Sequence, residues 1–175
     1  METGPNLNSK TVREHSSGSV FWVAAAILAV MFLLRDKDLN RPAPAFSLPD
    51  PYGGSVSLES YRGRPALLVF WTTWCGVCRA ELPVVNRLAP EFQRHGISIV
   101  AIHVGEAGNI PEYLRSNQLD LTTAMDTDGS VGQAYHVSGV PKLVLIGANG
   151  KILRSTAGMA DESTLENWME LAGKS

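Results

Sequence analysis

Two continuous apolar runs dominate the C-terminal three quarters of the chain. Residues 66–71 (Ala-Leu-Leu-Val-Phe-Trp) and 97–102 (Ile-Ser-Ile-Val-Ala-Ile) are each short and without charge, which predicts central strands buried on both faces. Between them, apolar residues recur at every third or fourth position from residue 76 to about His95, which predicts an amphipathic helix. This pattern predicts a strand–helix–strand unit at the centre of an α/β domain.

Shorter segments surround this unit. The Asn-Gly step at 149–150 predicts a tight hairpin, and the last helix can be capped by Asp161 or by a Ser163–Glu166 capping box. The order of elements predicts a mixed sheet with helices on both faces. The shorter elements are strands at 46–48, 56–58, 121–125, 142–146 and 151–154, and helices or helical turns at 110–117, 130–135 and 161–172.

A longer apolar segment precedes this domain. Residues 18–34 carry no charge and reach the ~17 residues that a helix needs to cross a bilayer. The segment has no polar face, and the prolines that follow it predict an extended linker. We therefore expect an N-terminal tail at 1–17, a transmembrane anchor at 18–34, a linker at 35–44 and a globular domain at 45–175.

A cleaved signal peptide is the main alternative to an anchor. The apolar run is longer than a usual signal-peptide core, and residues 35–38 (Arg-Asp-Lys-Asp) follow it without a small-x-small cleavage site, which favours the anchor. The Lys and Arg residues on either side weakly favour a cytoplasmic domain. The expectation of an exported domain therefore rests on the chemistry of the domain.

Composition narrows the function further. The chain has 175 residues, 45 % of them hydrophobic, and a net charge of −2, so nucleic-acid binding has no electrostatic support. Its only two cysteines, Cys75 and Cys78, form a single CxxC. The ring that such a pair closes is too small to constrain much chain, which indicates a reactive rather than an architectural disulfide.

The position of this pair suits thiol–disulfide exchange. Cys75 follows a predicted strand and opens a predicted helix, where free backbone N–H groups and the helix dipole favour the thiolate. Cys78 lies one turn further on the same face. Cys75 is therefore expected to form a mixed disulfide that Cys78 resolves, and Trp74 to offer a partner an apolar contact.

Other uses of the pair are less well supported. A closed zinc site needs four ligands, and His95, His103 and His136 lack the spacing to complete one, so we expect no metal or cofactor. His103 and His136 could line the site, but an exposed or structurally satisfied histidine is the simpler interpretation of each. A Cu(I) metallochaperone that uses both thiolates, with His136 as a further ligand, is the alternative function. A redox-inactive docking domain is a third.

A peroxidase site is a further alternative for the first cysteine. Thr72 stands three residues before Cys75, as in peroxiredoxins. However, Leu68 occupies the position where those sites carry a proline, and Cys78 is an additional cysteine that they lack. The sequence therefore favours exchange through the pair over peroxide reduction by a single thiol.

The segment 70–83 (Phe-Trp-Thr-Thr-Trp-Cys-Gly-Val-Cys-Arg-Ala-Glu-Leu-Pro) resembles the active site of thioredoxin-like proteins of the TlpA and ResA type. The resemblance extends to residues 45–48, 128–141 and 145–152, and in all spans roughly 42–173. These proteins are membrane-anchored thiol-disulfide oxidoreductases of the bacterial cell envelope. The resemblance implies a thioredoxin-like fold with a redox-active Cys75–Cys78 disulfide.

Roles for further residues follow from the same resemblance. Pro141 corresponds to a cis-proline that packs against the pair and leaves the backbone of Val140 free to bind a peptide. Pro83 corresponds to the proline that bends the active-site helix. Glu81 corresponds to an acid held near the pair, with an ordinary solvated helix residue as its alternative.

The resemblance also implies partners and location. It implies exchange with protein thiols and disulfides in the direction of reduction, as in cytochrome c maturation, with a membrane electron donor. We further expect a monomer anchored in the bacterial inner membrane, with its C-terminal domain in the periplasm or an equivalent extracytoplasmic space.

Three departures from related proteins leave the reduction potential of the cysteine pair and the identity of its partner undetermined. Val69 occupies the position of the buried aspartate of thioredoxin, so Glu81 is the remaining local acid. Gly76-Val77 replaces the Gly-Pro between the cysteines of thioredoxin, and Lys142 follows Pro141 where relatives usually carry Thr or Glu.

Overall fold

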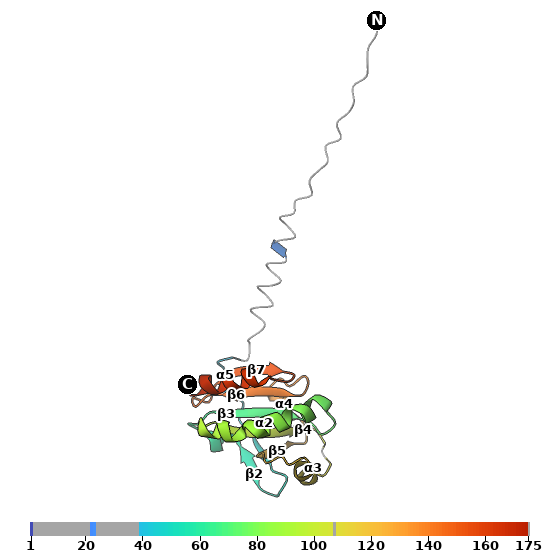
Figure 1. Ribbon diagram of the computed structural model, residues 1–175, viewed down its shortest axis with the longest axis vertical. Helices are drawn as coiled ribbons and strands as arrows, with labels where there is room; N and C mark the ends of the chain where they lie inside the picture. The colour runs from blue at the N-terminus through green and yellow to red at the C-terminus, as the bar shows by residue number, and fades with distance from the viewer. Residues whose placement is uncertain (2–21, 24–38, 107, 175) are drawn as a thin grey trace. The chain divides into compact units, whose positions relative to one another are not determined.

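The computed structural model describes residues 39–106 and 108–174, together with residues 1, 22 and 23 (Figure 1). The predicted anchor therefore lies outside the described residues, apart from Trp22 and Val23, which are helical. Among the residues that are described, no helix is long and apolar enough to cross a membrane. The chain divides into two units, residues 1–37 and 38–175, and the second is compact and contains the sheet.

A five-stranded mixed sheet in the order β5-β4-β3-β6-β7 forms the centre of the second unit. Strands β3, β4 and β5 are parallel, because helical crossovers connect them, whereas β6 and β7 are antiparallel to their neighbours. This confirms the predicted mixed sheet. The strands are β3 (Ala66–Trp71), β4 (Ser98–Val104), β5 (Thr123–Asp126), β6 (Lys142–Ile146) and β7 (Ile152–Ala157).

The two faces of the sheet are covered by different elements. Helices α2 (Gly76–Arg94), α3 (Ile110–Ser116) and α5 (Glu162–Ala172) contribute side chains to one buried cluster. The hairpin β1 (Ser47–Pro49) and β2 (Ser55–Ser57), together with α4 (Ser130–Ala134), covers the other face. The short helix η1 (Leu58–Tyr61) follows β2.

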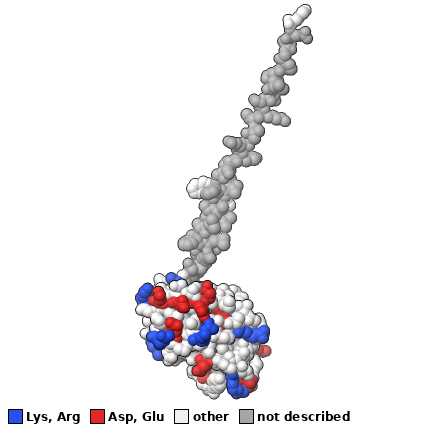
Figure 2. All heavy atoms as spheres, in the orientation of Figure 1, with Lys and Arg blue, Asp and Glu red and all other residues white. Residues whose placement is uncertain are grey.

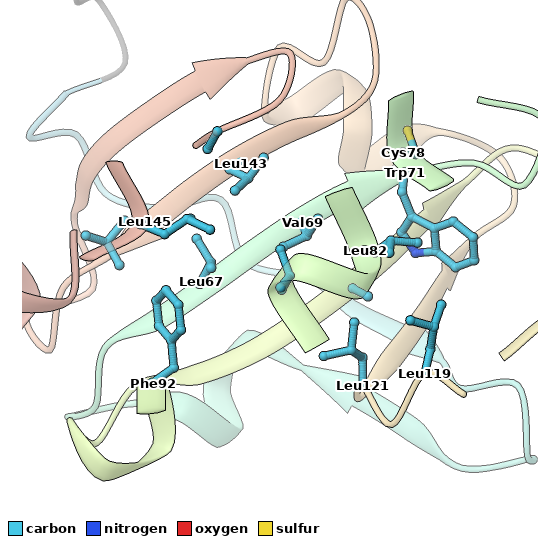
Figure 3. Close-up of a cluster of buried hydrophobic side chains, with 14 of the residues drawn as sticks. Leu67, Val69, Trp71, Cys78, Leu82, Phe92, Leu119, Leu121, Leu143 and Leu145 are labelled. Carbon is cyan, nitrogen blue, oxygen red and sulfur yellow. The ribbon is translucent and has the colours of Figure 1, made fainter. Parts of the chain in front are cut away.

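Strand β3 lies between the two clusters, and all six of its residues are buried. Alternate side chains point to opposite faces, so Leu67, Val69 and Trp71 meet the α2 side (Figure 3) while Leu68 and Phe70 meet the hairpin side. A strand buried on both faces is the structural reason for its continuous apolar sequence.

Several boundaries differ from the predicted ones. Residues 39–44 belong to the predicted linker, but Asn40 and Ala43 donate backbone hydrogen bonds to Ile152 and Gly150, so this stretch is attached to the β6–β7 hairpin. Strand β7 continues to Ala157, beyond the predicted end at residue 154, because it remains paired with β6. Of the two predicted caps of α5, the side chain of Asp161 accepts from Thr164 N.

Candidate active site

The CxxC lies where β3 passes into α2, as predicted. Cys75 is the N-cap of α2, and its Sγ accepts a hydrogen bond from Cys78 N at 3.1 Å. An N-cap position brings the free N–H groups and the positive end of the helix dipole close to this sulfur, and both stabilise a thiolate. The first turn of α2 contains no acidic residue to oppose this effect.

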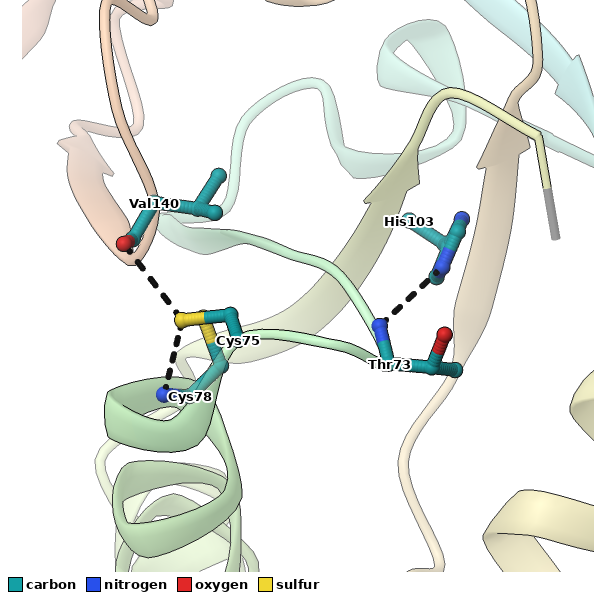
Figure 4. The surroundings of a disulfide bond; sticks show 5 residues. All are labelled: Thr73, Cys75, Cys78, His103 and Val140. Carbon is teal, nitrogen blue, oxygen red and sulfur yellow. Dashed lines mark hydrogen bonds between the residues drawn. A yellow bond between two sulfur atoms is a disulfide. The ribbon is translucent and has the colours of Figure 1, made fainter.

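Cys75 and Cys78 are joined in a disulfide (Figure 4). The two residues differ in accessibility, since Cys75 is 7 % exposed and Cys78 is fully buried. A partner approaching from solvent therefore meets Cys75 first. Cys78 belongs to the apolar cluster of Leu82 and Val85 on the inner face of α2.

The loop before β6 closes the site on the opposite side of the disulfide. The Val140–Pro141 peptide bond is cis, as the resemblance implied. The carbonyl oxygen of Val140 lies 3.5 Å from Cys75 Sγ (Figure 4), close enough to accept a hydrogen bond from this thiol after reduction. Pro141 is buried, and its carbonyl accepts from Gly158 N at 2.8 Å. The β7–α5 loop is thereby attached to the loop that contacts Cys75.

Glu81 is a buried acid one helical turn beyond Cys78. It is 1 % exposed, so the alternative of a solvated helix residue is wrong. Its Oε1 accepts from Ala160 N at 2.7 Å, while Oε2 is buried with no hydrogen-bond partner among the described residues. Burial raises the pKa of Glu81 to about 7, and the hydrogen bond from Ala160 opposes this only in part. A carboxyl group with such a pKa can accept or release a proton near neutral pH.

Exposed apolar side chains lie on two segments, the CxxC itself and the β7–α5 loop that is hydrogen-bonded to Pro141 and Glu81. Trp74 is 75 % exposed and Val77 is 50 % exposed, one just before Cys75 and the other between the cysteines. Met159, in the β7–α5 loop, is 57 % exposed. Within residues 39–174 as described, Tyr52 is the other large apolar side chain with comparable exposure. The sequence did not single out Met159, because nothing local to a loop methionine reveals that its loop lies beside the cis-proline.

His103 is expected from the sequence to be exposed or structurally satisfied, and the structure buries it completely at the end of β4. Its Nε2 accepts from the backbone N–H of Thr73, in the segment that leads to Cys75, at 3.4 Å (Figure 4). A β4 residue thereby contacts the active-site loop across 30 positions of sequence.

Lys142 does not line the site although it follows Pro141. It is buried, and its Nζ donates to the carbonyls of Tyr135 and His136 at 2.8 and 3.0 Å. Because it is paired with Phe70 in the sheet, it belongs to the face opposite α2. Val69 is also fully buried, in the apolar cluster that contains Cys78.

No cluster of metal ligands surrounds the site in the part of the chain that the structure describes. Among these residues, no group of three or more His, Cys, Asp or Glu side chains is placed to hold a metal ion. Asp126 serves another purpose, since its carboxylate accepts from the amides of Val131 and Gly132 at the start of α4. On the face shown in Figure 2, acidic and basic side chains are interspersed, in keeping with the small net charge.

Comparison with known proteins identifies a thiol-disulfide oxidoreductase and a thioredoxin-like protein among the relatives of this chain. Residues 39–155 match the AhpC/TSA family. The chain is 34 % identical over 130 residues to the thiol-disulfide oxidoreductase ResA of Bacillus subtilis, and the match covers 74 % of this chain and 73 % of the relative. It is 31 % identical over 142 residues to a thioredoxin-like protein of Haemophilus influenzae, with coverage of 81 % and 83 %.

Solved structures of similar fold agree with these sequence relatives. A crystal structure described as a putative thiol:disulfide interchange protein DsbE from Chlorobium tepidum superposes with a TM-score of 0.71. The two chains are 31 % identical, and the match covers 78 % of this chain and 98 % of the other. The sheet, the hairpin and the helices described above therefore form a thioredoxin-like fold.

Proposed function

Because the chain belongs to the AhpC/TSA family and is a thiol-disulfide oxidoreductase, we propose that it reduces disulfides of protein partners through Cys75 and Cys78. The observation that carries this proposal is the asymmetry of the two sulfurs. Cys75 is the more accessible residue, and its sulfur receives the Cys78 N–H at the start of α2, whereas Cys78 is fully buried behind it. The nucleophile and the resolving thiol are thus distinguished by position.

The exchange proceeds from the dithiol form in two steps. The Cys75 thiolate attacks one sulfur of the partner disulfide, that disulfide breaks, and the departing partner sulfur leaves as a thiolate that takes up a proton. The Cys78 thiol then loses its proton and attacks Cys75 Sγ, which releases the second partner thiolate. The partner gains two electrons and two protons, and the enzyme ends as the Cys75–Cys78 disulfide.

Glu81 is the proposed acceptor of the Cys78 proton. The two residues are three positions apart on α2, so they lie on the same face of the helix, and both are buried. Oε1 is held by Ala160 N, which leaves Oε2 as the oxygen to take the proton. In the ionised state Glu81 accepts this proton, and in the neutral state it returns one when the disulfide is reduced again.

Trp74, Val140 and Pro141 are the proposed partner-binding residues. Trp74 presents apolar surface beside Cys75, and Val140 lies next to Cys75 in the loop before β6, where its backbone would pair with an extended segment of a partner. A partner strand that contacts Val140 would place its own disulfide next to Cys75.

Trapping of mixed disulfides tests the roles of the cysteines. In cells that express the full chain, Cys78→Ser is expected to accumulate mixed disulfides that reductant releases, because Cys75 can still attack and nothing resolves the product. Cys75→Ser is the matched control and is expected to accumulate none. Equal trapping by both variants, or trapping by neither, would contradict the assignment.

The proposed setting is the outer face of the bacterial inner membrane. The apolar segment 18–34 supports a single-pass anchor, and the oxidoreductase activity supports a compartment in which protein disulfides form. A membrane electron donor would return the disulfide to the dithiol, and cytochrome c maturation is the proposed context, with the protein acting as a monomer. Labelling of intact spheroplasts with a membrane-impermeant maleimide, after a membrane-impermeant reductant has opened the Cys75–Cys78 disulfide, tests the location, since Cys75 should react only if the domain is outside the cytoplasm.

A further inference from the structure

The loop between β3 and α2 is held by a side chain from the neighbouring strand β4. Its backbone passes through Thr72, Thr73 and Trp74, and within this turn Cys75 N donates to Thr72 O at 3.4 Å. The Thr73 amide donates to His103 Nε2 instead. Trp74 is 75 % exposed, so its ring is not fixed by burial. The contact with His103 therefore restrains the loop from outside itself.

His103 is itself rigidly placed. It is 0 % exposed, and its ring meets that of Trp71, its neighbour in the sheet, edge to face with centroids 5.0 Å apart. The ring of Trp71 in turn packs against Tyr113 of α3, with centroids 5.3 Å apart. The position of Nε2 is thus set by the sheet and by α3 rather than by the loop that it contacts.

The contact requires the neutral imidazole. An imidazolium has no free lone pair, so Nε2 can accept from Thr73 only when the proton of the neutral ring is on Nδ1. Burial lowers the pKa of His103, and the backbone of Gly105 opposes this more weakly. The ring is therefore a competent acceptor at neutral pH.

We propose that His103 is a positioning residue of the exchange reaction, which fixes Trp74 and Cys75 for a partner by accepting the Thr73 amide. The role rests on the proposed function of Cys75 as the attacking thiol. His103 does not touch the reacting sulfurs, and it acts through the backbone of Thr73. A glutamine at this position can present its amide oxygen close to the place of Nε2, whereas an asparagine is shorter by one methylene and reaches only about as far as Nδ1.

The difference between these amides provides the test. We would compare wild type, His103→Gln, His103→Asn and His103→Leu for reduction of insulin and for hydrogen exchange of the Thr73 amide. Val100→Ala is the control for stability, because Val100 is buried on the same strand and packs against the opposite face. His95→Gln is the control for an exposed histidine.

Loss of the acceptor is expected to lower kcat/KM roughly tenfold in the Asn and Leu variants and to increase exchange of the Thr73 amide. His103→Gln is expected to stay within about threefold of wild type in both measurements, a difference that corresponds to a largely retained hydrogen bond. Val100→Ala should lower the melting temperature without either change. If Gln and Asn behave alike, or if Thr73 exchange is the same in wild type and His103→Leu, His103 does not position the loop.

Failure of the proposed function gives a different pattern. If wild type does not reduce insulin, or if Cys75→Ser retains the activity, the assignment of Cys75 is wrong. Exchange of the Thr73 amide still decides the role of His103 in that case, because it needs no substrate. If the Leu variant does not fold, the comparison of Gln with Asn decides it.

Discussion

Glu81 and Ala160 are 79 positions apart in sequence, yet the Ala160 amide donates to Glu81 Oε1 at 2.7 Å. The bond joins the active-site helix α2 to the loop before α5. The same loop is attached to the cis-proline segment through Gly158 N and Pro141 O. Hydrogen bonds therefore connect the helix that carries the acid and the disulfide with the cis-proline loop through the loop before α5.

The first prediction concerns pH and stability. Burial raises the pKa of Glu81 from 4.5 to about 7. The folded protein thus binds this proton more tightly than the unfolded chain, so its contribution is complete below pH 4.5 and is lost as pH rises to about 7. The difference corresponds to roughly 3 kcal/mol. We expect Glu81→Gln to raise the free energy of unfolding at pH 8 towards this amount and to change it little at pH 4, measured by urea unfolding.

The same substitution should alter the chemistry of the thiols. Because the amide introduced by Glu81→Gln cannot titrate, the pH profile of alkylation of the reduced pair should lose the component near pH 7. Glu170→Gln, at an exposed position of α5, is the control. It should leave the pH dependence of stability and the pH profile of alkylation as in wild type. A titration curve unchanged by Glu81→Gln would show that Glu81 does not exchange protons with the pair.

The second prediction concerns the apolar side chains beside the disulfide. Trp74→Ala and Met159→Ala should each raise KM for a protein disulfide about 5- to 30-fold, because each removes about 1–2 kcal/mol of contact with the partner. Reduction of a small disulfide such as DTNB should be nearly unchanged. Tyr52→Ala is the matched control, since Tyr52 is 73 % exposed in the β1–β2 turn. An equal rise in KM for the control would contradict a specific role of Trp74 and Met159 in partner binding.

The third prediction assigns Lys142 to stability rather than to partner choice. Its Nζ is hydrogen-bonded to the carbonyls of Tyr135 and His136, so Lys142→Met retains the aliphatic stem and removes the donor to both carbonyls. We expect a loss of about 1–3 kcal/mol in the free energy of unfolding, with the reduction potential and the KM for insulin close to wild type. A change in KM without a change in stability would place Lys142 in partner binding instead.

A fourth prediction concerns the start of α4. The carboxylate of Asp126 accepts from Val131 N at 3.1 Å and from Gly132 N at 2.7 Å, and it is fully buried. Asp126→Ala removes both acceptors, so we expect a loss of about 3 kcal/mol in the free energy of unfolding. The carboxylate of Asp128 accepts from Ser130 N at an exposed position, so Asp128→Ala should lower the free energy of unfolding by less. Chemical denaturation of the two variants gives the comparison, and similar losses would contradict it.

The strand–helix–strand unit and the place of the CxxC could be predicted from the amino-acid sequence alone. Strand β3 is apolar at every position and α2 is apolar at every third or fourth, and these periods reflect local geometry. The helix start makes Cys75 an N-cap, which also depends only on neighbouring residues. Resemblance to relatives added Glu81 and Pro141 as positions of interest.

The surroundings of the cysteine pair could not be predicted in this way, because they depend on how distant segments pack together. The burial of Glu81, its bond to Ala160 and the contact of His103 with Thr73 depend on segments that are 79 or 30 positions apart, and no local pattern specifies them. The side chain of Lys142 points to the face opposite α2 because Lys142 is paired with Phe70 in the sheet. Strand pairing and packing place these groups, because hydrogen-bond partners and burial are properties of the folded chain rather than of its segments.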